Sequence, residues 1–156
     1  MTGSTATDGC ASNRSDWITS DRDLRTAVEA GGAIAEAARA LVAVLHPHFV
    51  REEQIAMPPL ALLRALSRGE FRPEMAEVLP MTDALRAELP RMLEEHEAIE
   101  AALGRLKAAA EAEGRPDVAE FADGVVLHAR TEEEVLYPAS LMVGDWVRRQ
   151  AGRAPT

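Results

Sequence analysis

Two segments of the chain carry the same pattern of histidine, glutamate and proline. Residues 48–58 read HFVREEQIAMP and residues 128–138 read HARTEEEVLYP, so both fit H-x-x-x-E-E-x-x-x-x-P. In a helix, residues i and i+4 lie on one face, so each segment places an imidazole beside a carboxylate. A pair of this kind can bind a metal ion.

Each pair lies on an apolar stripe of its expected helix. Steps of three and four from His48 reach Glu52, and the same steps from His128 reach Glu132. The other members of the two stripes are apolar, namely Ile34, Ala38, Leu41, Leu45 and Ile55, and Val118, Phe121, Val125 and Val135. Such stripes pack into the core of a helical protein, which predicts that the histidine and the glutamate are buried.

Two further stripes each contain one polar residue. The first holds His96 among Leu85, Leu89, Met92, Ile99, Leu103 and Leu106. The second is shorter and holds Asp21 among Trp17, Leu24 and Val28. If the four stripes face one another, six polar residues converge inside the protein, namely Asp21, His48, Glu52, His96, His128 and Glu132.

Buried carboxylates of this kind need a positive partner, because an isolated charge in an apolar interior is costly. No lysine or arginine lies on the stripes. A cation held by neutral imidazoles and carboxylates meets the need. Mixed nitrogen and oxygen ligands suit a pair of first-row metal ions, iron or manganese above all, and disfavour calcium.

Composition indicates one soluble, helical domain. The 156 residues are 47% hydrophobic and 28% charged, with only 4% aromatic residues, which is ordinary for a globular chain and favours helix over sheet. A net charge of −9 argues against nucleic acid and anionic membrane as partners. The single cysteine, Cys10, cannot form an internal disulfide. The sequence has no basic-then-apolar leader and no apolar run near 20 residues. We therefore expect a cytoplasmic protein.

Turn signals divide the chain into four expected helices. They span residues 16–30, 33–57, 82–113 and 118–137, and are separated by Gly31-Gly32, a longer connection after Pro58-Pro59, and Gly114-Arg115-Pro116-Asp117. Thr82 and Asp83 are expected to cap the third helix. The pattern predicts an all-α, antiparallel, up-down four-helix bundle of two hairpins over 16–138. Residues 1–15 are expected to be a disordered leader and 139–156 a tail with a short helix.

The motifs resemble the hemerythrin-like, or HHE cation-binding, family, whose pattern is H…HxxxE…H…HxxxE. The resemblance rests on the two repeated segments and on Glu95-His96-Glu97. It implies an oxygen-bridged di-iron centre, with manganese or zinc as alternatives. His48, His96 and His128 are then terminal ligands, and Glu52 and Glu132 bridging carboxylates. In some relatives the carboxylate lies five residues after the histidine, which makes Glu133 the alternative bridging carboxylate.

The first helix departs from the family pattern. Asp21 stands where the family carries its first histidine. An anionic ligand there would favour the ferric state and ready autoxidation. Glu100 stands where some members carry another histidine, and is a further candidate ligand. His46 lies off the stripes and is interpreted as a bystander.

Three functions remain open at this stage. The first is a metal-binding protein that binds or senses dioxygen, nitric oxide or iron. The second is a di-iron redox enzyme that reduces peroxide or nitric oxide, or supplies iron for cluster repair. The third is a metal-free structural bundle. Binding or sensing is favoured over enzymatic activity, although fold and family alone do not assign a function.

Overall fold

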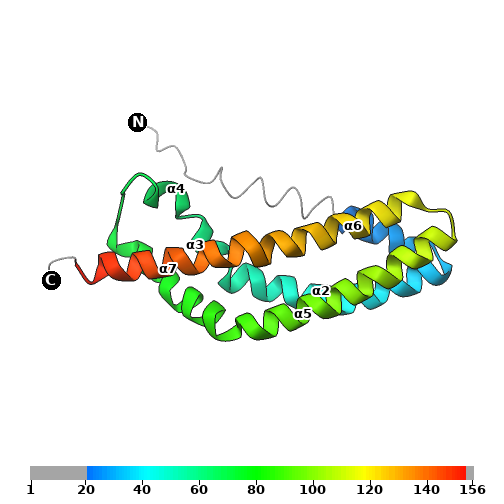
Figure 1. Cartoon of the computed structure of the whole chain (residues 1–156), viewed down its shortest axis with the longest axis horizontal. Helices are drawn as coiled ribbons and strands as arrows, with labels where there is room; N and C mark the ends of the chain where they lie inside the picture. Colours follow the sequence, from blue (N-terminus) through cyan, green and yellow to red (C-terminus); the bar gives the residue numbers. More distant parts are fainter. Residues whose placement is uncertain (1–20, 154–156) are drawn as a thin grey trace. The chain divides into compact units, whose positions relative to one another are not determined.

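A computed structural model describes residues 21–153, which are mainly helical and contain no β-strand within that range. The expected leader and the start of the first helix lie outside the described residues. Figure 1 shows the helices coloured along the sequence. The chain divides into two compact units. Unit 1 contains the described residues up to Ala43 together with Glu100–Val126, and unit 2 contains Val44–Ile99 and the chain from Leu127 onward. The all-α prediction is confirmed for the described part of the chain.

The helix α2 spans Gly32–Ile55 and carries the first repeated segment. It follows a helical segment at 21–29 and a turn in which Gly31 and Gly32 have φ values of 80° and 58°, a conformation that favours glycine. The predicted apolar stripe of α2 is confirmed, because its members are buried, namely Ile34, Ala38, Leu41, Leu45 and Ile55. Pro47 lies inside the helix without ending it.

By length and composition alone, α2 could cross a membrane. This corrects the expectation that no such stretch exists. The criterion is weak, because the core helix of a soluble protein also meets it, and α2 carries buried His48 and Glu52. Two buried ionisable side chains suit a helix packed inside protein better than one facing lipid.

The predicted long connection is made of short helical pieces. In unit 2, α2 is joined to α5 (Leu79–Ala112) by α3 (Met57–Leu60), α4 (Leu63–Leu66) and a 3₁₀ helix, η1 (Pro73–Val78). Prolines at the starts of α3 and η1 suit those positions, where their missing N–H costs nothing. An apolar cluster fixes η1 on the helix α7 (Tyr137–Ala151), with buried members Met75, Val78, Val143 and Val147.

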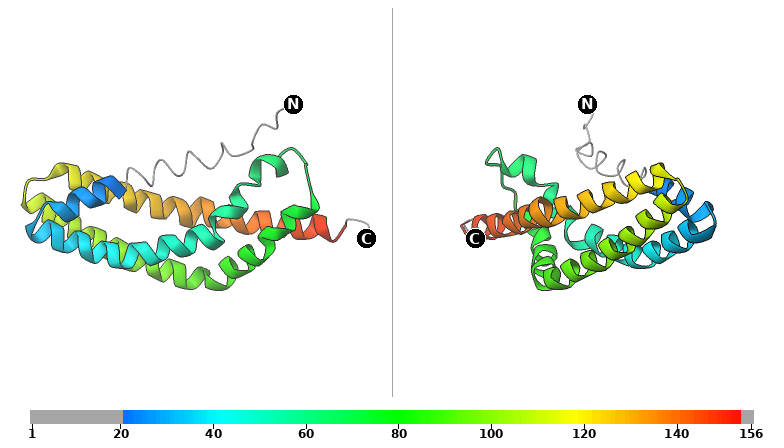
Figure 2. Two further views of the ribbon diagram at one scale, coloured as in Figure 1. Left: turned by 180° about the vertical axis from the view of Figure 1, so that it is seen from behind. Right: turned by 45° about the vertical axis from the view of Figure 1, so that its right-hand side comes forward.

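Helix α5 spans Leu79–Ala112 and carries His96. It begins before the predicted start, and Thr82 lies within it rather than at its cap, with its hydroxyl donating to the carbonyl of Leu79 at 3.1 Å. In unit 1, α5 turns back into α6 (Pro116–Thr131) at Gly114, whose φ is 67° (Figure 2). The turn predicted at Gly114-Arg115-Pro116-Asp117 is confirmed.

The last predicted helix continues past its expected end. A π-helical turn, η2 (Glu132–Leu136), follows α6 and leads into α7 (Tyr137–Ala151). The N–H of Tyr137 donates to the carbonyl of Glu132, five residues back. Pro138 lacks an N–H and would crowd the carbonyl four residues before it in an α-helix. The wider turn accommodates the proline, so the chain remains helical where a stop was predicted.

The α5–α7 contact in unit 2 depends on a glycine. A Cβ on Gly144 would lie 2.3 Å from Oγ1 of Thr82. We therefore expect Gly144→Ala to lower the free energy of unfolding by about 1–3 kcal/mol, the usual cost of overpacking. Gly124→Ala is the matched control, because a Cβ there meets nothing within 4 Å and alanine favours helix. Thermal melting of both variants tests this. Equal melting temperatures would show that Thr82 accommodates the added methyl group at no cost in stability.

Candidate metal centre

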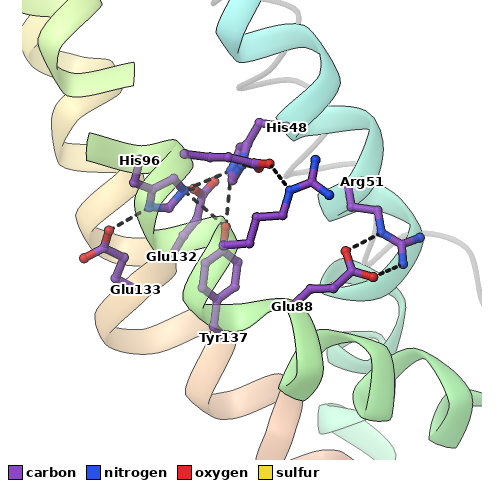
Figure 3. A network of polar contacts seen from close by, with 9 residues as sticks. His48, Arg51, Glu88, His96, Glu132, Glu133 and Tyr137 are labelled. Atoms are coloured by element: carbon purple, nitrogen blue, oxygen red, sulfur yellow. Dashed lines mark hydrogen bonds and ion pairs between the residues drawn. The ribbon is translucent and has the colours of Figure 1, made fainter. Parts of the chain in front are cut away.

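Three buried polar side chains converge in unit 2. His48 comes from α2, His96 from α5 and Glu132 from the π turn, and each is 1–2% exposed. One ligand atom from each lies within 4.8 Å of the others (Figure 3). Two of these three elements carry the repeated segments, so the repeat does deliver an imidazole and a carboxylate to one place.

The two imidazoles face each other through their Nε2 atoms, which are 2.9 Å apart. The other nitrogen of each ring, Nδ1, contacts a carboxylate. Nδ1 of His48 lies 2.9 Å from Glu95, and Nδ1 of His96 lies 2.7 Å from Glu133. A carboxylate accepts, so Nδ1 carries the hydrogen and a neutral ring presents its Nε2 lone pair. Two lone pairs at 2.9 Å repel, and a positive charge between them removes the repulsion.

Glu132 links two histidines. Its Oε2 lies 3.3 Å from Nε2 of His96, and its Oε1 lies 2.6 Å from Nε2 of His128. Burial would raise the pKa of Glu132, but the hydrogen bonds with His128 and His96 outweigh burial and hold that pKa at about 2. Glu132 is therefore an anion in the core, with histidines on both sides.

Glu52 lies beside this group and is 1% exposed. Its Oε1 has no hydrogen-bond partner among the described residues. Burial, and then the negative charge of Glu132, raise the pKa of Glu52 to about 9. A buried oxygen without a donor is costly, and a cation shared by Glu52 and Glu132 would satisfy both carboxylates.

The two histidines differ in their pKa. Burial lowers the pKa of His48, and the hydrogen bond to Glu95 does not fully offset it. Burial acts in the same direction on His96, but hydrogen bonds with Glu132 and Glu133 outweigh it and raise that pKa. His96 is thus the ring that takes up a proton more readily when no metal ion holds its lone pair.

The geometry fits a first-row metal ion. Ligand atoms on neighbouring corners of an octahedron with bonds of about 2.1 Å are about 3.0 Å apart. The contacts between the two Nε2 atoms and between His96 and Glu132 are 2.9 and 3.3 Å. A histidine whose other nitrogen donates to a carboxylate is the usual form of a metal-binding histidine.

The predicted candidates divide into a central set and its neighbours. His48, His96 and Glu132 come together, and Glu52 and His128 adjoin Glu132. The side chain of Glu133 is 38% exposed and contacts the outer nitrogen of His96, which suits an orienting role. Glu132 therefore belongs to the buried group and Glu133 does not. His46 is exposed.

Asp21 and Glu100 belong to unit 1, and both are exposed. The Asp21 side chain is 71% exposed and pairs with Arg25 at 3.1 Å. The prediction that Asp21 lies on a buried stripe is therefore wrong. Ala27 is the buried residue of this helical segment, and Asp21 lies nearly two turns before it, where a hydrated carboxylate avoids the cost of burial. The expected autoxidation loses its structural basis with this correction.

Glu95 and Tyr137 contact the site although neither was predicted as a site residue. Glu95 directly precedes His96, and Tyr137 is the last residue before the proline of the second motif. Val135 was predicted to be buried, but it is 54% exposed, whereas Tyr137 is 1% exposed. The π turn explains why Tyr137 is buried and Val135 is not, because the extra residue of the turn shifts the following side chains around the helix axis. The one sequence feature that could have indicated the π turn was the proline that follows an otherwise continuous apolar stripe.

These features define an all-helical protein with a buried histidine–glutamate group that suits a metal ion. The family model for the hemerythrin HHE cation-binding domain matches residues 20–140. The chain belongs to this family. No curated protein and no solved structure matches the chain.

Proposed function

We propose that this chain holds a pair of iron ions and uses them to bind or sense dioxygen or nitric oxide. The observation that carries the proposal is the pair of imidazoles, whose Nε2 atoms lie 2.9 Å apart while carboxylates hold both outer nitrogens. This arrangement is unfavourable without a positive charge and favourable around a metal ion.

Glu52 and Glu132 support two ions rather than one. Both carboxylates are buried side by side, and a carboxylate has two oxygens, so each can join neighbouring ions. In this proposal His48 and His96 bind near one end of Glu132, and His128 binds near the other. Membership of the family supports iron, whereas manganese and zinc accept the same donors.

The surroundings of the site favour a small ligand. The two central histidines and both glutamates are nearly inaccessible, whereas the side chain of His128 is 29% exposed. A diatomic molecule can reach such a site more readily than a larger substrate. We further propose that the chain has the antiparallel four-helix bundle fold predicted from its sequence, and that the protein acts in the cytoplasm without nucleic acid or membrane partners.

Elemental analysis of protein purified without chelators, together with aerobic and anaerobic absorption spectra, tests the function. The proposal predicts about two iron ions per chain and a spectrum that changes reversibly with oxygen or nitric oxide. Multiple turnover of peroxide or nitric oxide would instead show a redox enzyme. Protein that takes up no ferrous iron, and melts identically with and without a chelator, would contradict the proposal.

His128 in α6 and His46 in α2 provide a paired prediction. His128→Ala should lower bound iron to about half or less, because His128 contacts Glu132 at 2.6 Å. His46→Ala should retain the parent's iron, because His46 is exposed. The iron content per chain of both purified variants measures this difference. Equal losses would remove His128 from the ligand set.

A further inference from the structure

The hydroxyl of Tyr137 points into the group of metal-binding donors. Its oxygen lies 3.2 Å from Nε2 of His96 and 3.4 Å from Nε2 of His48 (Figure 3). The residue is 1% exposed. The hydroxyl has one hydrogen and can donate it to only one of these two nitrogens. The hydroxyl also hydrogen-bonds with Glu52, so its oxygen lies against two imidazoles and a buried carboxylate of the proposed site.

The spacing matches that of a ligand. The distances of 3.2 and 3.4 Å from the oxygen to the two nitrogens are close to the 2.9 Å between the nitrogens themselves. They are also close to the roughly 3.0 Å that separates neighbouring ligands on one first-row metal ion. One ion within reach of both imidazoles is therefore within reach of the phenol oxygen.

The π turn accounts for this placement. Tyr137 follows Glu132 by five residues, and its N–H donates to the carbonyl of Glu132. In a π turn, residue i+5 stacks near residue i, whereas in an α-helix it would point away. The turn therefore brings a phenol and a carboxylate from one segment to the same site. Single π turns inside α-helices are frequent at functional sites.

The sequence also lacks the histidine that the family pattern places in the first helix. Asp21, which stands where the family's first histidine is expected, is exposed and paired with Arg25. We propose that Tyr137 is itself a metal ligand in this chain, through its phenolate oxygen. This inference rests on the proposed iron site. When the ion binds, the O–H bond breaks, an oxygen–iron bond forms and the proton leaves to solvent, as for other acidic ligands.

The test uses the full chain loaded with ferrous iron under anaerobic conditions and then oxidised in air. A phenolate bound to ferric iron gives a visible charge-transfer band and resonance-Raman modes of the tyrosine ring. Tyr137 is the single tyrosine of the sequence, so any such signal is assigned without ambiguity. We expect both signals in the parent protein and neither in Tyr137→Phe, which retains the buried ring.

Iron content measured on the same samples separates this inference from the proposed function. About two irons per chain without a tyrosinate signal would overturn Tyr137 as a ligand and leave the iron site standing. Protein that binds no iron would overturn both. Trp146→Phe is the aromatic control, since Trp146 packs on Phe71, and its spectrum should equal the parent's. Tyr137→Phe should also weaken iron binding by at least the roughly 10–100-fold typical of losing an outer-shell partner.

Discussion

Glu132→Gln is expected to abolish stoichiometric metal binding. Glu132 contacts both His96 and His128 through separate oxygens, and its low pKa makes it a fixed negative charge of the site. The amide has nearly the same shape but no charge and one fewer acceptor oxygen. The loss of affinity should exceed the roughly 10–100-fold that follows removal of an outer-shell partner. Titration of the metal-free variant with ferrous iron under anaerobic conditions measures it.

Glu134→Gln is the matched control. Glu134 lies two residues further along the same π turn and is exposed, so the change in net charge is identical while the buried group is untouched. The control should bind iron like the parent. If both variants bind iron with the parent's affinity, Glu132 is not a ligand.

Glu52→Gln should stabilise the metal-free protein while it weakens metal binding. The pKa of Glu52 rises from 4.5 to about 9 on folding. Between these values the folded state holds a proton that the unfolded state has lost, so stability falls as pH rises, and below 4.5 the effect vanishes. Each pKa unit corresponds to about 1.4 kcal/mol. Glutamine removes this penalty without removing the side chain's volume.

Melting of metal-free protein between pH 5 and pH 9 measures the effect, as a difference between variant and parent. The advantage of Glu52→Gln should grow with pH, by roughly 2–4 °C for each kcal/mol in a chain of this size. Glu53→Gln, on the exposed neighbour, should follow the parent at every pH. A constant difference across this range would show that Glu52 ionises in the folded state as it does in the unfolded state.

The sequence was most informative where a pattern extended over many residues. The apolar stripes of α2 and α5 each extend over several helical turns, so the face of the helix that turns toward the core is well defined. His48 and His96, which lie on these stripes, are both buried as predicted. The stripe around Asp21 had four members, and Asp21 proved exposed. A short stripe does not fix which residues of a helix face the core, because one or two apolar side chains can be left half-buried at little cost.

The second motif shows why the rest of the site could not be predicted. Counting by threes and fours assumes 3.6 residues per turn, and this assumption holds through Glu132. The π turn then changes the count, so Tyr137 and not Val135 turns inward. Glu95 was missed for a different reason. Its contact with His48 joins residues 47 apart in sequence, and only the packing of two helices brings them together.

The most direct test of the metal site is an anomalous difference map at the iron absorption edge, from crystals of the iron-loaded protein. We predict two peaks, one within bonding distance of Nε2 of His48 and His96, and the other near His128, with Glu52 and Glu132 between them. Peaks at the protein surface, or none in crystals of protein that contains two irons per chain, would contradict this assignment.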